Sequence, residues 1–225
     1  MKEAKHRSFP ATIDTGDAVL QGDVVLPHAA QGIVLFAHGS GSSRFSTRNR
    51  YVANHLVAGG VGTLLFDLLT TEEEVRDMRD ASLRFDIDLL TRRLLGVTDW
   101  LRARAASPSL GYFGASTGAA AALRAAVALR PPVDAVVSRG GRPDLAGAPV
   151  LQRVNCPTLL IVGSLDTEVL ALNRQALAQI GPSGTLLQIA GATHLFEEPG
   201  TLEQAAQAAC EWFTQHLHAH RVQGA

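Results

Sequence analysis

Short apolar runs alternate with amphipathic segments along almost the whole chain. The runs are rich in Val, Ile, Leu and Phe, and most of them end at a glycine or a polar residue. Such runs are typical of strands buried on both faces, whereas the segments between them repeat apolar residues at helical spacing. This order of strand, helix and strand predicts a mostly parallel sheet covered by helices on both faces.

Glycine, proline and polar residues mark the ends of the predicted elements. The parallel strands are expected at 32–39, 61–67, 110–115, 133–141, 157–164 and 184–196, the last including its loop. The helices are expected at 46–60, 81–105, 116–130, 167–180 and 201–219. Residues 11–26 form an antiparallel hairpin around Thr15-Gly16-Asp17 at the front of this sheet.

Two loops bear on access to a site. Residues 140–155 are too few to form a helical cap, so we expect an open cleft. The second is the polar stretch 68–79, which carries Glu72, Glu73 and Glu74. In one interpretation this stretch covers part of the mouth of the cleft. In the other, Thr71 and Glu74 form a capping box for the following helix.

Composition narrows the class of protein. The chain has 225 residues, 46% of them apolar, and a net charge of −1, so we expect one domain, 1–225, with a sizeable core. No basic block indicates nucleic acid, no apolar run is long enough for a membrane span, and the charged start lacks a signal-peptide core. We therefore expect a cytoplasmic protein. Cys156 and Cys210 are expected as reduced core thiols, although the sequence does not exclude a bridge between them.

Candidate chemistry gathers after the strands, where ligands bind in open parallel sheets. Gly114-Ala115-Ser116-Thr117-Gly118 fits the pattern G-x-S-x-G at a strand-to-helix junction. The tight turn of such a nucleophile elbow strains the serine backbone and needs small neighbours. The alternative for Ser116 is a small helix cap.

A serine hydroxyl needs a base, and the base needs an acid. Asp166 follows the strand 157–164, and His194 follows the last strand, which gives the chain order Ser, Asp, His. We predict Ser116 as nucleophile, His194 as general base and then acid, and Asp166 as the group that orients it. Asp166 could instead cap its helix, and Asp144 is the rival acid.

An oxyanion hole needs two fixed donors. We predict the backbone N–H groups of Thr117 and Ser40, with Gly41 as the fallback for the second. His38 is expected to hold its own turn.

Several other patterns have competing interpretations. Arg139, Arg44 and Arg142 lie in loops at the same edge, as surface charge or as binding groups for a carboxylate or phosphate, with Arg139 the best candidate. The glycine loop after residue 38 lacks the residues of a nucleotide-binding motif. The C-terminal histidines 216, 218 and 220 have poor ligand spacing. No metal and no cofactor is therefore expected.

Five segments together carry a family resemblance: "HGSGSSR", "GYFGASTGAAAA", "VVSRGGRPDLAG", "LLIVGSLDT" and "GATHLFEEPG". They resemble the α/β-hydrolase superfamily, close to its dienelactone hydrolase-like branch, and more specifically a small hydrolase domain also found fused to phosphoribosyltransferases. The resemblance runs from about residue 18 to 217 and implies the α/β-hydrolase fold without a large cap, and ester-type hydrolysis. Dienelactone hydrolases proper have cysteine where this chain has Ser116, which argues against that substrate.

These observations predict a serine hydrolase of carboxylic esters with small or exposed acyl groups, acting through an acyl-enzyme on Ser116. The ester is a small molecule, optionally anionic. Two alternatives stay open: a thioesterase or acyl transferase with the same triad, and a non-catalytic accessory module associated with a phosphoribosyltransferase. The sequence does not give the oligomeric state.

Overall fold

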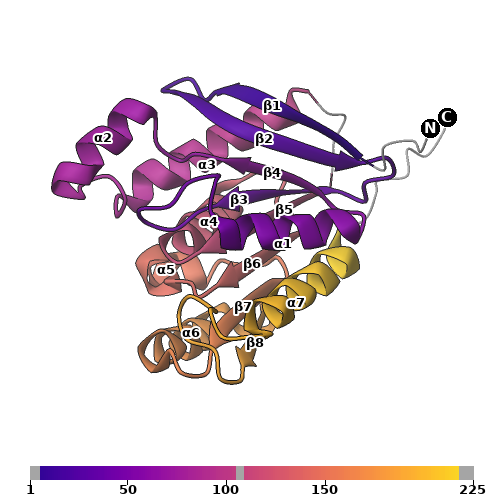
Figure 1. Ribbon diagram of the computed structural model, residues 1–225. Coiled ribbons are helices and arrows are strands. Elements are labelled where there is room, and N and C mark those ends of the chain that lie inside the picture. Colours follow the sequence, from indigo (N-terminus) through magenta and orange to yellow (C-terminus); the bar gives the residue numbers. More distant parts are fainter. Residues whose placement is uncertain (1–5, 105–108, 218–225) are drawn as a thin grey trace.

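All the strands of the described chain share one sheet. The computed structural model describes residues 6–104 and 109–217, and its strands follow the order β1-β2-β4-β3-β5-β6-β7-β8 (Figure 1). They are β1 (His6–Asp14), β2 (Val19–Pro27), β3 (Ile33–Ala37), β4 (Gly62–Phe66), β5 (Leu110–Ala115), β6 (Ala135–Arg139), β7 (Thr158–Gly163) and β8 (Gly184–Ile189).

The sheet is parallel from β4 to β8 and antiparallel at its front. Strands β1 and β2 form the expected hairpin across Thr15-Gly16-Asp17, with Ile13 opposite Leu20, and β2 then pairs antiparallel with β4. The central strands β3, β5 and β6 are buried at every position, as their unbroken apolar runs predict. The predicted fold class is confirmed.

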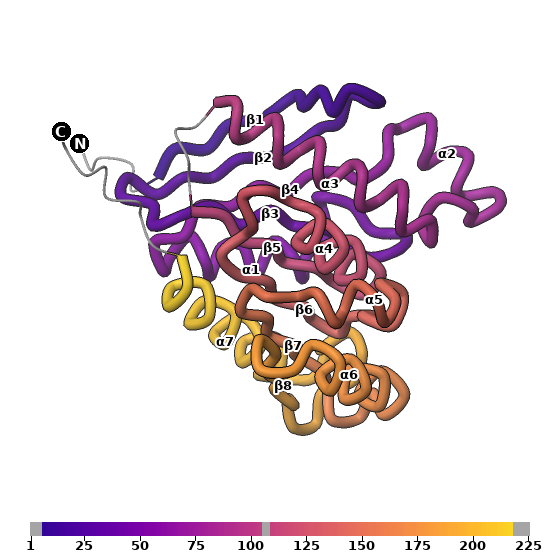
Figure 2. Tube along the Cα trace, turned by 180° about the vertical axis from the view of Figure 1, so that it is seen from behind, coloured from indigo at the N-terminus to yellow at the C-terminus, as the bar shows by residue number. Residues whose placement is uncertain are grey.

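Helices cover both faces. On one face, α1 (Thr47–Ala58) packs against α7 (Thr201–His216), and Figure 1 shows both in front of the sheet. Seen from behind in Figure 2, α3 (Ile87–Arg102), α4 (Thr117–Ala128) and α6 (Thr167–Ile180) lie over the other face. Each face has its own apolar cluster. Phe213 belongs to the cluster under α1 and α7, and Leu94 belongs to the cluster on the other face.

The segment 140–155 adds no helical cap. It contains only a short 3₁₀ turn, Pro143–Ala146, and a single helical turn, α5 (Ala148–Leu151). The carboxyl edge of the sheet therefore stays accessible beside this segment.

The segment 68–79 differs from the expected loop. It contains a helix, α2 (Thr71–Asp80), which begins soon after β4 and lies beside α3 in Figure 1. The predicted capping box of Thr71 and Glu74 is wrong by one residue. The Thr70 side chain accepts from the amide of Glu73, and the Glu73 carboxylate accepts from the amide of Thr70. The next helix accordingly starts at Ile87 rather than at residue 81.

Two further expectations concern the chain as a whole. Within 6–104 and 109–217, no helix combines the length and the apolar character needed to cross a membrane. Cys156 and Cys210 are both free thiols, and burial raises the pKa of each.

Candidate active site

Ser116 lies in the turn between β5 and α4 with a strained backbone. Its φ of 50° is in the left-handed region that side chains rarely adopt. The turn depends on close approach at the flanking glycines. A Cβ on Gly118 would lie 2.1 Å from the carbonyl oxygen of Ala37, and one on Gly114 would lie 2.4 Å from the Cα of Ala119. These contacts match the geometry expected of a nucleophile elbow.

His194 and Asp166 meet although 28 residues separate them. His194 Nδ1 lies 2.6 Å from Asp166 Oδ2, and the Asp166 carboxyl is 13% exposed. Asp166 stands at the N-terminus of α6, but its side chain makes no capping hydrogen bond there. The carboxylate is thus used for the imidazole and not for the helix.

The rival acid is engaged elsewhere. Asp144 accepts two hydrogen bonds from the guanidinium of Arg142, at 2.9 and 2.7 Å, in a bidentate ion pair. Arg142 is one of the three arginines considered for substrate binding. Its guanidinium does not line the cavity that contains Ser116.

Ser116 and His194 line one cavity of about 260 Å³, together with Arg139. Its other walls come from the loop after β3 and the start of α1. The structure therefore brings the predicted nucleophile, base and best arginine candidate to one place.

Two backbone amides are available beside Ser116. Over the described residues, neither the N–H of Ser40 nor that of Thr117 donates to another group of the chain. Thr117 is the first residue of α4, so its amide also lies at the positive end of the helix dipole. Such preorganised donors suit an oxyanion.

The imidazole of His38 holds the loop that carries Ser40. Its Nδ1 lies 2.9 Å from the carbonyl oxygen of Gly39, and its Nε2 accepts from the amide of Leu68. Because Nε2 is an acceptor, the proton is on Nδ1, and burial lowers the pKa of this side chain. The expected structural role of His38 thus has a physical basis.

Arg139 is a buried cation that has no carboxylate partner within the described part of the chain. Its side chain is 8% exposed, Nη2 donates to Asn49 Oδ1 at 3.3 Å, and Nη1 has no partner among the described residues. The rings of Phe113 and Phe196 lie about 6 Å from the guanidinium carbon. Burial, with a contribution from the nearby charge of Arg48, lowers the pKa of Arg139 to about 10. At neutral pH an uncompensated cation therefore faces the cavity.

Arg44 is committed to the fold. Its guanidinium forms a close ion pair with Asp67 and lies 3.6 Å from a carboxylate oxygen of Asp23. Arg44 lines a different cavity, whose walls come from the start of β2, the segment 43–45 and the start of α2. Of the three arginines, only Arg139 reaches the cavity of Ser116.

In the described parts of the chain, no group of three or more His, Cys, Asp or Glu side chains is placed to hold a metal ion. Of the C-terminal histidines, residues 218 and 220 lie outside the described residues.

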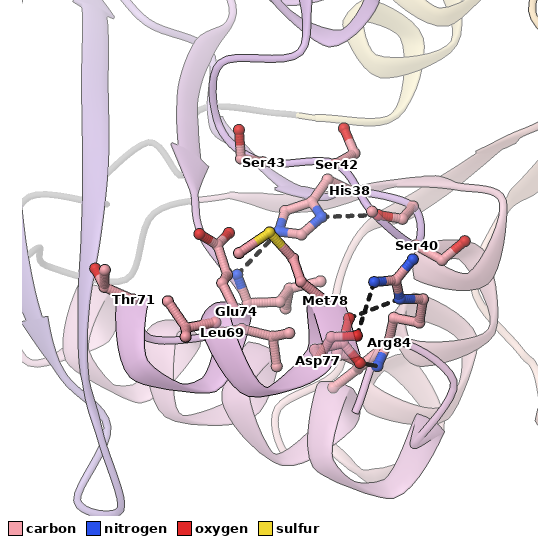
Figure 3. Close-up of a pocket in the computed structure, with 15 residues that line it drawn as sticks. His38, Ser40, Ser42, Ser43, Leu69, Thr71, Glu74, Asp77, Met78 and Arg84 are labelled. Carbon is pink, nitrogen blue, oxygen red and sulfur yellow. Dashed lines mark hydrogen bonds and ion pairs between the residues drawn. The ribbon is translucent and has the colours of Figure 1, made fainter. Parts of the chain in front are cut away.

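A second cavity, of about 450 Å³, lies between α2 and the loop after β3. Figure 3 shows Glu74 and Met78 reaching from α2 toward His38 and the serines of that loop. The sequence does not reveal this cavity, because the segment that encloses it reads as a polar loop. The one available signal is the Thr-x-x-Glu pattern, which marks a helix start.

We compared the sequence and the fold with known proteins. No family model matches the chain. A crystal structure of a dienelactone hydrolase from Anabaena variabilis is 53% identical, covers 96% of this chain and 100% of its own, and superimposes with a TM-score of 0.92. Est1E from Butyrivibrio proteoclasticus shares the fold, with a TM-score of 0.77 at 16% identity over 92% of this chain and 98% of its own.

A longer relative was found among curated proteins. A Mycobacterium tuberculosis protein that carries the name phosphoribosyl transferase is 57% identical over 213 residues, which are 94% of this chain. The chain spans 47% of that relative, so the name describes a protein about twice as long. The full-length match to the Anabaena structure, at 53% identity, shows that the chain belongs to the dienelactone hydrolase-like family of α/β-hydrolases.

Proposed function

We propose that the protein is a serine hydrolase of carboxylic esters that works through an acyl-enzyme on Ser116. The observation that carries the proposal is the contact of Asp166 Oδ2 with His194 Nδ1 at 2.6 Å, made by a carboxylate that leaves its own helix uncapped. A histidine held in this way presents its other nitrogen as a base. The crystal structure from Anabaena, described as a dienelactone hydrolase, supports hydrolysis of an ester bond.

The reaction has two balanced halves. His194 accepts the proton of Ser116 as Oγ attacks the ester carbonyl, and the resulting oxyanion binds the amides of Ser40 and Thr117. His194 then donates the proton to the leaving alcohol oxygen as its bond to carbon breaks. In the second half, His194 takes a proton from water as the hydroxide attacks the acyl carbon. The bond from that carbon to Oγ then breaks, His194 returns the proton to Ser116, and the carboxylic acid leaves.

Arg139 extends the proposal to an anionic substrate. A buried guanidinium with an unpartnered Nη1 at the cavity is suited to bind a carboxylate or phosphate group of the ester. Anion binding would compensate a charge for which residues 6–104 and 109–217 supply no counter-ion.

A non-catalytic accessory role is the second candidate, because the relative named phosphoribosyl transferase is about twice as long as this chain. A fluorophosphonate probe, which phosphonylates activated serines, separates the two. We expect labelling of the wild type and of Ser138→Ala, and none of Ser116→Ala. Ser138 is a matched control, since it also lies near a strand end but has a fully buried Oγ.

Activity is then measured with p-nitrophenyl esters of increasing acyl length. We expect Ser116→Ala to lower kcat by at least about a thousandfold. Absence of both labelling and turnover in the wild type, beside a reference hydrolase that reacts, would contradict the proposal and favour the accessory role. A panel of water, alcohols and thiols as acceptors distinguishes hydrolysis from acyl transfer.

A further inference from the structure

The cavity beneath α2 adjoins the cavity of Ser116. The two share Gly39, Ser40 and Ser42 as lining residues, so only the loop that carries a proposed oxyanion donor lies between them. The α2 cavity is therefore the neighbouring space into which one part of a substrate bound to Ser116 would extend. The question is which part of an ester each one accepts.

The walls of the α2 cavity are mainly apolar. Its apolar lining consists of Leu68, Leu69, Val75, Met78 and Leu90. Leu68, Leu69 and Leu90 are buried, and they form the inner wall, while Val75 and Met78 are 44% and 72% exposed at the outer side. Bringing a hydrocarbon group against these side chains removes apolar surface from water on both partners.

Two polar side chains of this wall, His38 and Asp77, are already satisfied within the chain. Both nitrogens of His38 make hydrogen bonds. Asp77 accepts from the amide of Leu83. It also accepts from the amide of Arg84 and from Arg84 Nε at 2.6 Å, and Figure 3 shows Arg84 and Asp77 joined by dashed lines. His38 and Asp77 therefore offer few free donors or acceptors to a polar ligand.

Glu74 sets the charge preference of the cavity. Among the described residues its carboxylate has no ion pair within 4 Å, and burial, with the nearby charge of Asp67, raises its pKa. A carboxylate here repels a substrate anion, whereas Arg139 attracts one in the neighbouring cavity. The two cavities are therefore opposite in electrostatic character.

The position of His194 decides the orientation. His194 must protonate the leaving oxygen, so the alcohol part of the ester lies on its side, in the cavity that it shares with Arg139. The α2 cavity contains neither residue. We propose that the cavity between α2 and the 39–43 loop binds the acyl group of the substrate, as a neutral hydrocarbon chain or ring, while an anionic group is carried on the alcohol side. This inference rests on the proposed ester hydrolysis.

The volume agrees with a medium-sized acyl group. A cavity of about 450 Å³ lies within the range of small-molecule sites, so it exceeds the needs of an acetyl group. We expect kcat/KM to rise from acetyl to butyryl esters by roughly tenfold, as two buried methylene groups contribute.

Filling the cavity tests the assignment. Val75→Trp places an indole at the outer wall, on a helix position that is already exposed and should tolerate it. Arg76→Trp is the matched control, since it adds the same side chain on the solvent side of α2 and breaks only an exposed ion pair to Asp80. We expect Val75→Trp to remove the preference for butyrate over acetate, and Arg76→Trp to retain it.

A second series varies the alcohol and keeps the acetyl group. We expect both Trp variants to show the same dependence of kcat/KM on the alcohol group as the wild type. An unchanged acyl-length profile in Val75→Trp, or a changed alcohol profile, would overturn the assignment while acetate turnover still upholds the hydrolase itself. Loss of acetate turnover and of probe labelling in the wild type would instead reject the proposed function.

Discussion

The amide of Leu68 donates to Nε2 of His38 at 3.0 Å, across 30 residues of sequence. This bond fixes the imidazole tautomer, and Nδ1–H then holds the carbonyl oxygen of Gly39. The peptide between Gly39 and Ser40 is planar, so fixing its carbonyl also fixes the direction of the Ser40 N–H. His38 is thereby a positioning residue for the proposed oxyanion hole, acting through a peptide bond.

We predict that His38→Ala lowers kcat by about tenfold with little change in KM, since a loosened donor affects the transition state more than the bound ester. Steady-state kinetics on p-nitrophenyl butyrate measure this. Equal losses in the His55→Ala control, which removes an exposed histidine paired with Gln207, would argue against a positioning role.

The same histidine predicts a pH effect on stability. Burial lowers the pKa of His38, so the unfolded chain binds its proton more tightly than the folded chain. The free energy of unfolding should therefore decrease as the pH falls through the ordinary value of 6.5. His38→Asn should be less stable at neutral pH but show a shallower decrease between about pH 7 and pH 5, measured by urea denaturation. Parallel curves for the two proteins would assign the decrease to other groups.

Asp166→Asn should lower kcat by about a thousandfold, because an amide cannot stabilise the imidazolium of His194. Asp144→Asn is the control of the same chemistry and should retain activity, since Asp144 only binds Arg142. The reverse result would make Asp144 the acid of the triad.

Arg139→Met should separate binding from stability. Replacing a buried cation that lacks a counter-ion should raise the free energy of unfolding by about 1 kcal/mol. It should also raise KM for 4-acetoxybenzoate, whose leaving group is anionic, by about tenfold or more, and leave phenyl acetate unchanged. Arg142→Met is the control and should treat both esters as the wild type does. Equal effects of Arg139→Met on the two esters would exclude an anion site.

The tight turn at Ser116 predicts a local limit on substitution. Gly118→Ala would bring a Cβ to 2.1 Å from the carbonyl oxygen of Ala37, so we expect a loss of several kcal/mol or failure to fold. Gly60→Ala, at a φ of 86° with open space around it, should cost about 1 kcal/mol. Denaturant midpoints compare the two variants. Similar losses in the free energy of unfolding would show that the turn at Ser116 can relax.

The sequence was most informative for polar residues that directly follow a buried strand. Ser116, Asp166 and His194 each follow an apolar run, and parallel strands bring such positions to one edge. The ion pairing of the arginines was not predictable in this way. Whether Arg44 or Arg139 finds a carboxylate depends on side-chain packing, and Asp67 lies 23 residues from Arg44. The helix α2 was missed because its solvated residues lack a strong apolar stripe, and because Thr70 and Thr71 both fit a capping box.

The helix α2 is secured at both of its ends. Thr70 and Glu73 cap its start, Asp77 anchors the turn that follows it, and Arg93 from α3 binds Glu73 at 2.6 Å. None of these anchoring contacts involves Val75 or Met78, which are 44% and 72% exposed. Mutations there carry little thermodynamic penalty for the fold, yet they reshape the proposed acyl cavity. Substrate range could therefore diverge among homologues at these two positions while the scaffold and the catalytic groups stay unchanged.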